Sequence, residues 1–151
     1  MAKRKIKKDR FDNWQQPKIE HGKLTKWNWV VYRPENFKLG KKTDIGVFTA
    51  IFAHYGVTIE DEVQIGSHCT LYSASTIDDK QGPVVLKRNS RIGSHSIVMP
   101  GVTVGENTIV GAQSFVNKDL PANEVWAGSP VCFIMTLEEY LKKLEKRKKV
   151  K

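Results

Sequence analysis

The chain has 151 residues, of which 40% are hydrophobic and 27% are charged, and its formal net charge is +9. No stretch approaches the run of about 18 apolar residues that a membrane-spanning helix needs, so we expect no membrane span. The two cysteines lack metal-ligand spacing and argue against a disulfide framework.

The positive charge belongs to the two ends of the chain. Residues 1–8 contain five Lys/Arg and residues 141–151 contain seven, whereas acidic side chains slightly outnumber basic ones between them. We therefore expect solvated tails and no nucleic-acid partner. The alternatives are an electrostatic arm for nucleic acid or an anionic membrane, and contact with anionic cofactors or nucleotide sugars. No apolar segment follows the basic N-terminus, so we expect no signal peptide and a cytoplasmic location.

The N-terminal quarter precedes a repeat. Residues 1–10 are charged and poor in apolar groups, which predicts a disordered tail. Residues 11–38 are rich in aromatic residues, and the alternation of Trp27, Trp29 and Val31 with their neighbours predicts a strand. We interpret residues 11–38 as a cap over the open edge of the repeat. The alternative is a wall whose aromatic faces stack on an acceptor sugar or base.

A period of six residues organises the next part of the chain, residues 39–135. Its aliphatic slots include Ile59, Ile65, Leu71, Ile77, Leu86, Ile92, Val98, Val104, Val110 and Val116. This period fits neither an amphipathic helix nor a single strand. It is typical of a solenoid in which three six-residue sides make one coil. We expect about four coils, beginning near Ile45 and Ile51, with a continuous aliphatic core.

Counting three slots to a coil assigns residues to corners. The count puts Ile51, Leu71, Ile92 and Val110 on one side, so that Ser73, Ser94 and Ala112 form a column at one corner. By the same count His54 and His95 share that corner, two coils apart, and His68 lies at another. The step of nine from Ile77 to Leu86 leaves a loop at residues 78–85, which is the best loop candidate for a functional site.

The sequence pattern at the end of the chain predicts a helix. Thr136-Leu-Glu-Glu139 is a capping box, which predicts a basic helix within residues 136–151. Leu137, Tyr140, Leu141 and Leu144 lie on one face, and we expect this face to close the C-terminal end of the solenoid.

The stretch from Arg91 to Pro121, followed by Trp126-Ala-Gly-Ser-Pro130, resembles the hexapeptide-repeat acyltransferases and, among them, the sugar and galactoside acetyltransferase branch. The resemblance covers roughly residues 40–135. It implies an all-β fold, a left-handed parallel β-helix, here with a C-terminal α-helix. It also implies an acetyl-CoA donor, a sugar or nucleotide-sugar acceptor of cell-envelope polysaccharide synthesis, and a homotrimer with sites between subunits.

The resemblance also implies a set of cofactor-binding residues. Ser94, Gly111, Ala112, Asn117 and Lys118 match positions that hold coenzyme A. Small side chains permit close approach of an extended pantetheine arm, and Lys118 would meet phosphate charge; plain corner packing is the alternative for Ser94 and Ala112. An arginine common in the family is replaced by Cys132.

The catalytic base is a second departure, because Thr76 stands where the family has a histidine. The remaining candidates are His95, His54 and a neighbouring subunit's His68, since an imidazole can accept a proton near neutral pH. Each histidine could also be a plain surface residue. Asp78 and Asp79 would orient the base or bind the acceptor, or serve only the turn. Pro100 stands where a zinc-binding β-helix would need a second histidine, so we expect no metal.

Two functions follow from the sequence. The first is an acetyl-CoA-dependent O- or N-acetyltransferase acting on a sugar. The second is a non-catalytic trimeric β-helix module used for assembly. Retention of Ser94, Ala112 and Lys118 favours the first.

Overall fold

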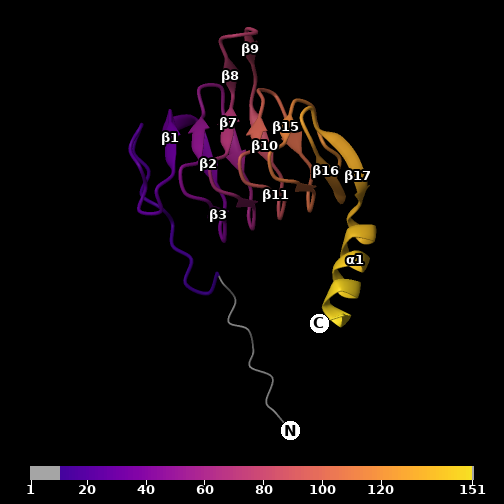
Figure 1. Cartoon of the computed structure of the whole chain (residues 1–151). Helices are drawn as coiled ribbons and strands as arrows, with labels where there is room; N and C mark the ends of the chain where they lie inside the picture. The colour runs from indigo at the N-terminus through magenta and orange to yellow at the C-terminus, as the bar shows by residue number, and fades with distance from the viewer. Residues whose placement is uncertain (1–10, 151) are drawn as a thin grey trace.

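The structure is a computed structural model and describes residues 11–150. The predicted tail at residues 1–10 therefore lies outside the described residues. The chain winds as a parallel β-helix whose coils succeed one another from the N-terminal segment to the C-terminal helix (Figure 1). This confirms the predicted fold class.

Three sheets form the sides of the solenoid, here called sheets A, B and C. Sheet A has the strand order β1 (Val30–Tyr32), β4 (Ala50–Phe52), β7 (Thr70–Tyr72), β12 (Ile97–Val98) and β15 (Phe115–Val116). Sheet B consists of β2 (Phe37–Leu39), β5 (Val57–Ile59), β10 (Val84–Leu86) and β13 (Thr103–Val104). Sheet C consists of β3 (Asp44–Ile45), β6 (Gln64–Ile65), β11 (Arg91–Ile92), β14 (Ile109–Val110), β16 (Glu124–Ala127) and β17 (Cys132–Thr136).

The core is a set of aliphatic columns, because the same slot of each coil pairs in register with the next. In sheet A, Ile51 pairs with Leu71, and Val98 pairs with both Leu71 and Val116. In sheet C, Ile92 pairs with Ile65 and Val110. All of these side chains are buried. Burial of apolar surface, at about 25 cal/mol per Å², is thus distributed along the whole axis of the solenoid.

The expected place of Ile77 in the core is wrong. Ile77 is 98% exposed and lies between β8 (Ala74–Ser75) and β9 (Lys80–Gln81), which pair as an antiparallel hairpin. Leu86 takes the core slot of that coil, because it pairs directly with Ile59. One slot is therefore lost from the count after Leu71, and every predicted side and corner beyond that point moves by one.

The first coil begins earlier than expected. Strands β1 and β2 pair with β4 and β5, so residues 30–45 already form a turn of the solenoid. The strand predicted around Trp27 and Trp29 begins only at Val30. Trp29 is buried and Trp27 is 39% exposed. A short 3-10 helix, η1 (Pro34–Asn36), connects β1 to β2.

The C-terminal end is closed differently from the prediction. Leu120 and Val131 belong to the core cluster and Trp126 packs against it, whereas helix α1 (Leu137–Lys149) buries no residue. The capping box is confirmed, since Thr136 Oγ1 accepts from Glu139 N and Glu139 accepts from Thr136 N. Helix α1 has few apolar residues and packs beside β17 without covering the core. Leu141, on its apolar face, is 48% exposed.

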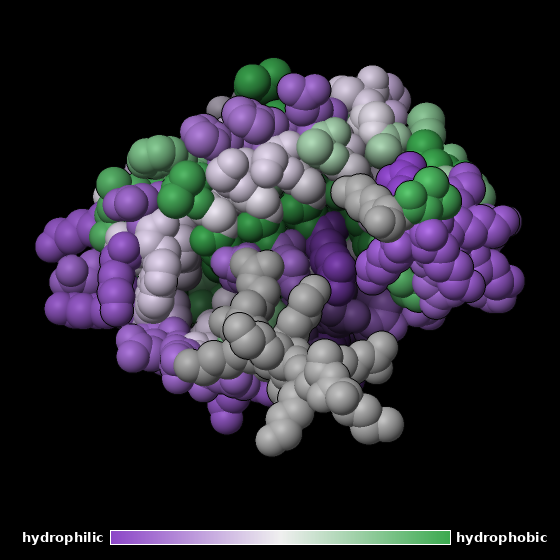
Figure 2. Space-filling view, turned by 60° about the horizontal axis from the view of Figure 1, so that its bottom comes forward, coloured by the Kyte–Doolittle hydropathy of each residue, from purple (hydrophilic) through white to green (hydrophobic). Residues whose placement is uncertain are grey.

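The N-terminal segment and α1 both extend below the sheets (Figure 1). The underside is recessed, and both hydrophobic and hydrophilic residues are visible in the recess (Figure 2). Within the part of the chain that the structure describes, no helix is long and apolar enough to cross a membrane.

The reactivity of Cys69 tests how tightly the core of the solenoid is packed. Its thiol is buried and donates to Gly93 O at 3.2 Å, and burial raises the pKa of the Cys69 thiol. The thiolate is the reactive form, so exposed Cys132 should be alkylated at pH 8 at least about 100-fold faster than Cys69. The pKa of the Cys69 thiol is higher in the folded state than in the unfolded state. The contribution of the protonated thiol to the free energy of unfolding is therefore complete below the thiol's ordinary pKa. It is lost as the pH rises through the folded-state value. Mass spectrometry of timed alkylation measures both rates, and equal rates would contradict the buried position of Cys69.

Candidate functional site

One corner of the solenoid carries a column of small residues. It connects sheet C to sheet A and is called the C–A corner, comprising residues 46–49, 66–69, 93–96 and 111–114. Ser67, Ser94 and Ala112 follow one another along it, since His95 N donates to Ser67 O at 3.0 Å and Gln113 N donates to Ser94 O at 2.9 Å. The predicted stacking of Ser94 on Ala112 is therefore confirmed.

Ser73 does not belong to that column. It follows sheet A, where its Oγ accepts from Tyr55 N at 2.9 Å and donates to Phe52 O at 2.6 Å. The reason is the slot lost at Ile77, which separates the columns of Leu71 and Ile92.

Glycines allow the coils to approach closely at the C–A corner. A Cβ built at Gly93 would lie 2.6 Å from the carbonyl carbon of Gly111 and closer still to Ala112 N. One built at Gly66 would lie 2.5 Å from Ser94 N. Such distances leave no room for a methyl group between coils. At Ser67, Ser94 and Ala112 the corner therefore presents backbone and small side chains, which an extended ligand can approach.

Two of the candidate histidines stack at this corner. The rings of His68 and His95 are 4.8 Å apart between centroids and nearly parallel at 3°, and Phe48 lies next to His68 at 5.4 Å. All three residues have positive φ, between 56° and 60°, which is uncommon for residues with large side chains. Both histidines are exposed. The prediction that His68 lies at a different corner from His95 is wrong.

His54 lies elsewhere, at the corner connecting sheet A to sheet B, called the A–B corner. The predicted pairing of His54 with His95 at one corner is therefore wrong, again because of Ile77. The ring centroids of His54 and Phe52 are 6.4 Å apart. The backbone carbonyl oxygen of His54 accepts a hydrogen bond from Asn36 Nδ2 at 3.1 Å.

The A–B corner and the β8–β9 hairpin enclose a cavity, called the hairpin pocket, of about 450 Å³. Its lining residues are Arg33, Glu35, Asn36, His54, Tyr55, Ala74, Ser75, Thr76, Asp79 and Gln81. Thr76 and His54 thus line the same cavity, although they are far apart in the chain. Sequence reasoning missed Tyr55 and Arg33 as lining residues, whereas Asp79 was one of the two aspartates singled out in the loop. The doubled aspartate and the loop position were the available signals for Asp79.

Asp78 does not line the hairpin pocket. Its Oδ2 lies 3.1 Å from Lys80 Nζ, and hydrogen bonds from Ser75 and Lys80 hold the pKa of the Asp78 carboxyl below its usual range. These partners belong to the hairpin itself. The contacts therefore favour the turn role for Asp78. The carboxylates that line the cavity are Asp79, at φ 55°, and Glu35, which lies 3.5 Å from Arg33 Nη1.

Asn117 and Lys118 lie across sheet A from Ala112. They follow β15, five residues after Ala112, and the turn at Gln113 keeps the span below the about 16 Å of a fully extended chain. Lys118 Nζ lies 5.2 Å from the centre of the Trp126 ring, at the C-terminal end. The predicted cofactor residues thus fall into two groups, on either side of sheet A.

The outer face of sheet A between the two groups is uncharged. Tyr32, Phe52 and Tyr72 stack along it, with centroid distances of 4.8 and 5.1 Å. The neighbouring outward row consists of Val30, Ala50, Thr70, Ile97 and Phe115. Among residues 11–150 no group of three His, Cys, Asp or Glu side chains has the geometry of a metal site.

Comparison with known proteins gives matches over the solenoid. Residues 83–118 match the family model described as bacterial transferase hexapeptide (six repeats). The chain is 34% identical over 113 residues to the galactoside O-acetyltransferase of Escherichia coli (strain K12), covering 69% of this chain and 56% of that protein. The chain thus spans about half the length of the galactoside O-acetyltransferases that it matches.

Two solved structures are similar in fold and carry ligands. One is a hexapeptide-repeat-containing acetyltransferase from Vibrio cholerae O1 biovar eltor complexed with acetyl coenzyme A, with 26% identity and a TM-score of 0.69. That match covers 72% of this chain and 64% of the other. The second is a mutant of AntD, an N-acyltransferase from Bacillus cereus, in complex with dTDP-4-amino-4,6-dideoxyglucose and coenzyme A. It has 28% identity and a TM-score of 0.57, and the match covers 80% of this chain and 76% of that one.

Proposed function

Since the chain belongs to the hexapeptide-repeat acetyltransferases, we propose that it transfers an acetyl group from acetyl-CoA to a hydroxyl or amine of a sugar. A nucleotide sugar, as a precursor of cell-envelope polysaccharide, is the acceptor class that we favour. The observation that carries the proposal is the small-residue column of Ser67, Ser94 and Ala112. An extended pantetheine arm can lie against such a column, and its amides can bond to corner backbone groups that the coils leave free.

The acceptor would occupy the hairpin pocket. A volume of about 450 Å³ suits a sugar with part of a nucleotide. Arg33, whose guanidinium lies 3.5 Å from Glu35, would bind a phosphate. Asp79 would accept from a sugar hydroxyl or an ammonium group. The ligands of the similar AntD complex, an amino sugar nucleotide and coenzyme A, belong to this chemical class.

The two half-sites belong to different corners, which supports a homotrimer with each site between two subunits. In such an assembly the small-residue column of one subunit would face the hairpin pocket of its neighbour across the uncharged face of sheet A. Burial of Phe52, Tyr72 and Ile97 there would stabilise the contact. We place the protein in the cytoplasm, where its donor and nucleotide sugars are available.

The reaction needs a base. His54 would take the proton from the acceptor hydroxyl or amine as that atom attacks the thioester carbonyl. The tetrahedral intermediate would then expel the coenzyme A thiolate, which is reprotonated, leaving the acetylated sugar. His95 and His68 of the adjacent corner are the other candidates for the base. Backbone N–H groups would stabilise the oxyanion.

Acceptor-dependent release of coenzyme A tests the proposal. The full chain is incubated with acetyl-CoA and nucleotide sugars with and without a free amine, and free coenzyme A is separated by chromatography and quantified. We expect release with at least one acceptor and calorimetric binding of acetyl-CoA alone. Absence of acetyl-CoA binding at millimolar concentration would sink the proposal and leave a β-helix used for assembly.

Substitution of histidines identifies the base. His54→Gln should lower kcat by about 10²–10³-fold with a hydroxyl acceptor, since positioned acid–base catalysis contributes that much. His68→Gln tests a rival candidate for the base and should change kcat by less than about threefold if His54 has that role. Steady-state rates at saturating acetyl-CoA give the comparison. A large loss in His95→Gln with little change in His54→Gln would place the base at the C–A corner.

A further inference from the structure

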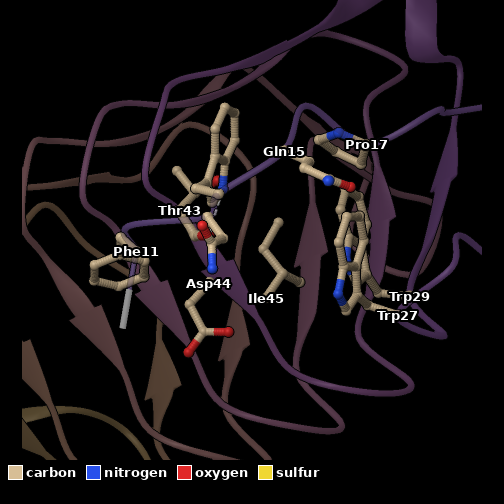
Figure 3. Close-up of a pocket in the computed structure, with 10 residues that line it drawn as sticks. Phe11, Gln15, Pro17, Trp27, Trp29, Thr43, Asp44 and Ile45 are labelled. Atoms are coloured by element: carbon tan, nitrogen blue, oxygen red, sulfur yellow. Dashed lines mark hydrogen bonds between the residues drawn. The ribbon is translucent and has the colours of Figure 1, made fainter. Parts of the chain in front are cut away.

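A second cavity lies at the N-terminal end of the solenoid, away from the hairpin pocket. It has a volume of about 220 Å³ and is called the tryptophan pocket. Its lining residues are Phe11, Asn13, Trp14, Gln15, Pro17, Trp27, Trp29, Thr43, Asp44 and Ile45. Three of the four tryptophans of the chain gather here. Figure 3 shows Trp27 and Trp29 on one side of the cavity and Phe11, Thr43 and Asp44 on the other.

Hydrogen bonds hold the Trp14 indole and the backbone turn that carries Trp27 and Trp29. Trp14 Nε1 donates to Thr43 O at 2.9 Å, which ties the segment to the start of β3. The backbone N–H of Trp29 donates to Thr25 Oγ1 at 3.4 Å, and Thr25 N donates to Trp29 O at 2.8 Å, so the turn carrying Trp27 is closed. Pre-organised aromatic rings lose little entropy when a ligand stacks on them.

Hydrogen-bonding groups of the pocket remain available. Trp29 is 3% exposed, yet within residues 11–150 its indole N–H has no partner. It is not sealed from solvent either, since Ser90 Oγ is the one buried side-chain polar atom without a partner in this part of the chain. The N–H therefore keeps some exposure, and Trp29 lines the cavity. Asn13 and the amide NH₂ of Gln15 are likewise unbonded in the described chain, whereas Gln15 Oε1 accepts a long bond of 3.5 Å from Lys26.

These features favour one class of ligand. A pyranose ring has an apolar C–H face that packs on an indole and an edge of hydroxyls that need donors and acceptors. The pocket offers both, with indole faces beside two carboxamides and an indole N–H. Its 220 Å³ is smaller than the roughly 300–1,000 Å³ of sites for drug-sized ligands, which excludes a nucleotide or coenzyme A and leaves room for one ring.

We propose that the tryptophan pocket is a non-catalytic binding site for a single sugar residue. It lies at the N-terminal end of the axis, whereas Lys118 and Trp126 lie at the C-terminal end. A saccharide held there would anchor a longer glycan on the protein without entering the hairpin pocket. The site does not depend on the transferase activity proposed above.

Saturation-transfer NMR with methyl glycosides of glucose, galactose and N-acetylglucosamine tests the site. We expect transfer to the ring protons of at least one glycoside, with a millimolar Kd. Trp27→Ala should weaken it at least tenfold, because this partly exposed indole supplies a stacking face, and Gln15→Ala should weaken it less. Trp126→Phe, at the other end of the solenoid, is the matched control and should bind as the unaltered chain does.

Acetyl-CoA titration of the same variants separates this site from the transferase site. Trp27→Ala should bind acetyl-CoA with unchanged affinity, which also shows that the variant is folded. No saturation transfer to any of the three glycosides would overturn the proposal. A glycoside Kd that is unchanged in Trp27→Ala would overturn it as well.

Discussion

Gly93→Ala should lower the melting temperature by about 10 °C. The added methyl group would lie 2.6 Å from the carbonyl carbon of Gly111, and neither atom belongs to a flexible side chain. The coils must therefore move apart at the C–A corner. Overpacking of this kind costs about 3 kcal/mol, and for a chain of this length each kcal/mol shifts the melting temperature by about 2–4 °C.

Gly101→Ala is the matched control for this effect. A Cβ at Gly101 meets no atom within 4 Å, but its φ of +81° disfavours alanine. The expected cost is only about 1 kcal/mol, from the backbone conformation alone. Differential scanning calorimetry at one fixed protein concentration compares the two variants. Equal losses would show that close approach between coils is not what the corner glycine provides.

Ala112→Tyr should weaken acetyl-CoA binding by at least about 100-fold, which corresponds to about 2.7 kcal/mol. Ala112 is exposed on the small-residue column, so a phenol ring would occupy the path of the pantetheine arm. The fold should not suffer, since the new side chain points to solvent. Isothermal titration calorimetry gives the affinity, and the melting temperature checks folding.

Ala122→Tyr gives the same substitution at another corner. Ala122 is equally exposed, and it stands against Gly105 as Ala112 stands against Gly93, with a built Cβ close to its backbone nitrogen. This variant should bind acetyl-CoA like the unaltered chain. If both tyrosines weaken binding alike, the donor does not lie on the C–A corner.

The sequence predicted the solenoid itself because its signal is local and repeated. Every sixth residue must be aliphatic if it points to a shared axis, and Ile92, Val98 and Val104 satisfy that rule without knowledge of distant contacts. The capping box at Thr136 is equally local. Such features survive any error in the count of coils.

The site was predicted less well, because assigning a residue to a corner requires counting every six-residue slot that precedes it. Ile77 satisfies the period but lies at the tip of a hairpin, so one false slot misplaced His68 relative to His95. The Gly82-Pro83 pair before Val84 was a turn signal that favoured restarting the count at Leu86. Trp14 donates a hydrogen bond to Thr43 O, and His54 lines the same cavity as Thr76. Both arrangements join segments that are distant in the chain, so no local sequence pattern predicts them.

The β8–β9 hairpin also bears on how such a chain can change over generations. It is inserted at a single corner, and the strands on either side of it, β7 and β10, keep their registers with β4 and β5. Lengthening, shortening or replacing the insertion therefore need not disturb the corner that carries Ser94 and Ala112. Descendants of one ancestor could retain a common thioester donor and diverge in acceptor through this single segment. Comparing hairpins, rather than whole solenoids, should then group such proteins by the molecule they modify.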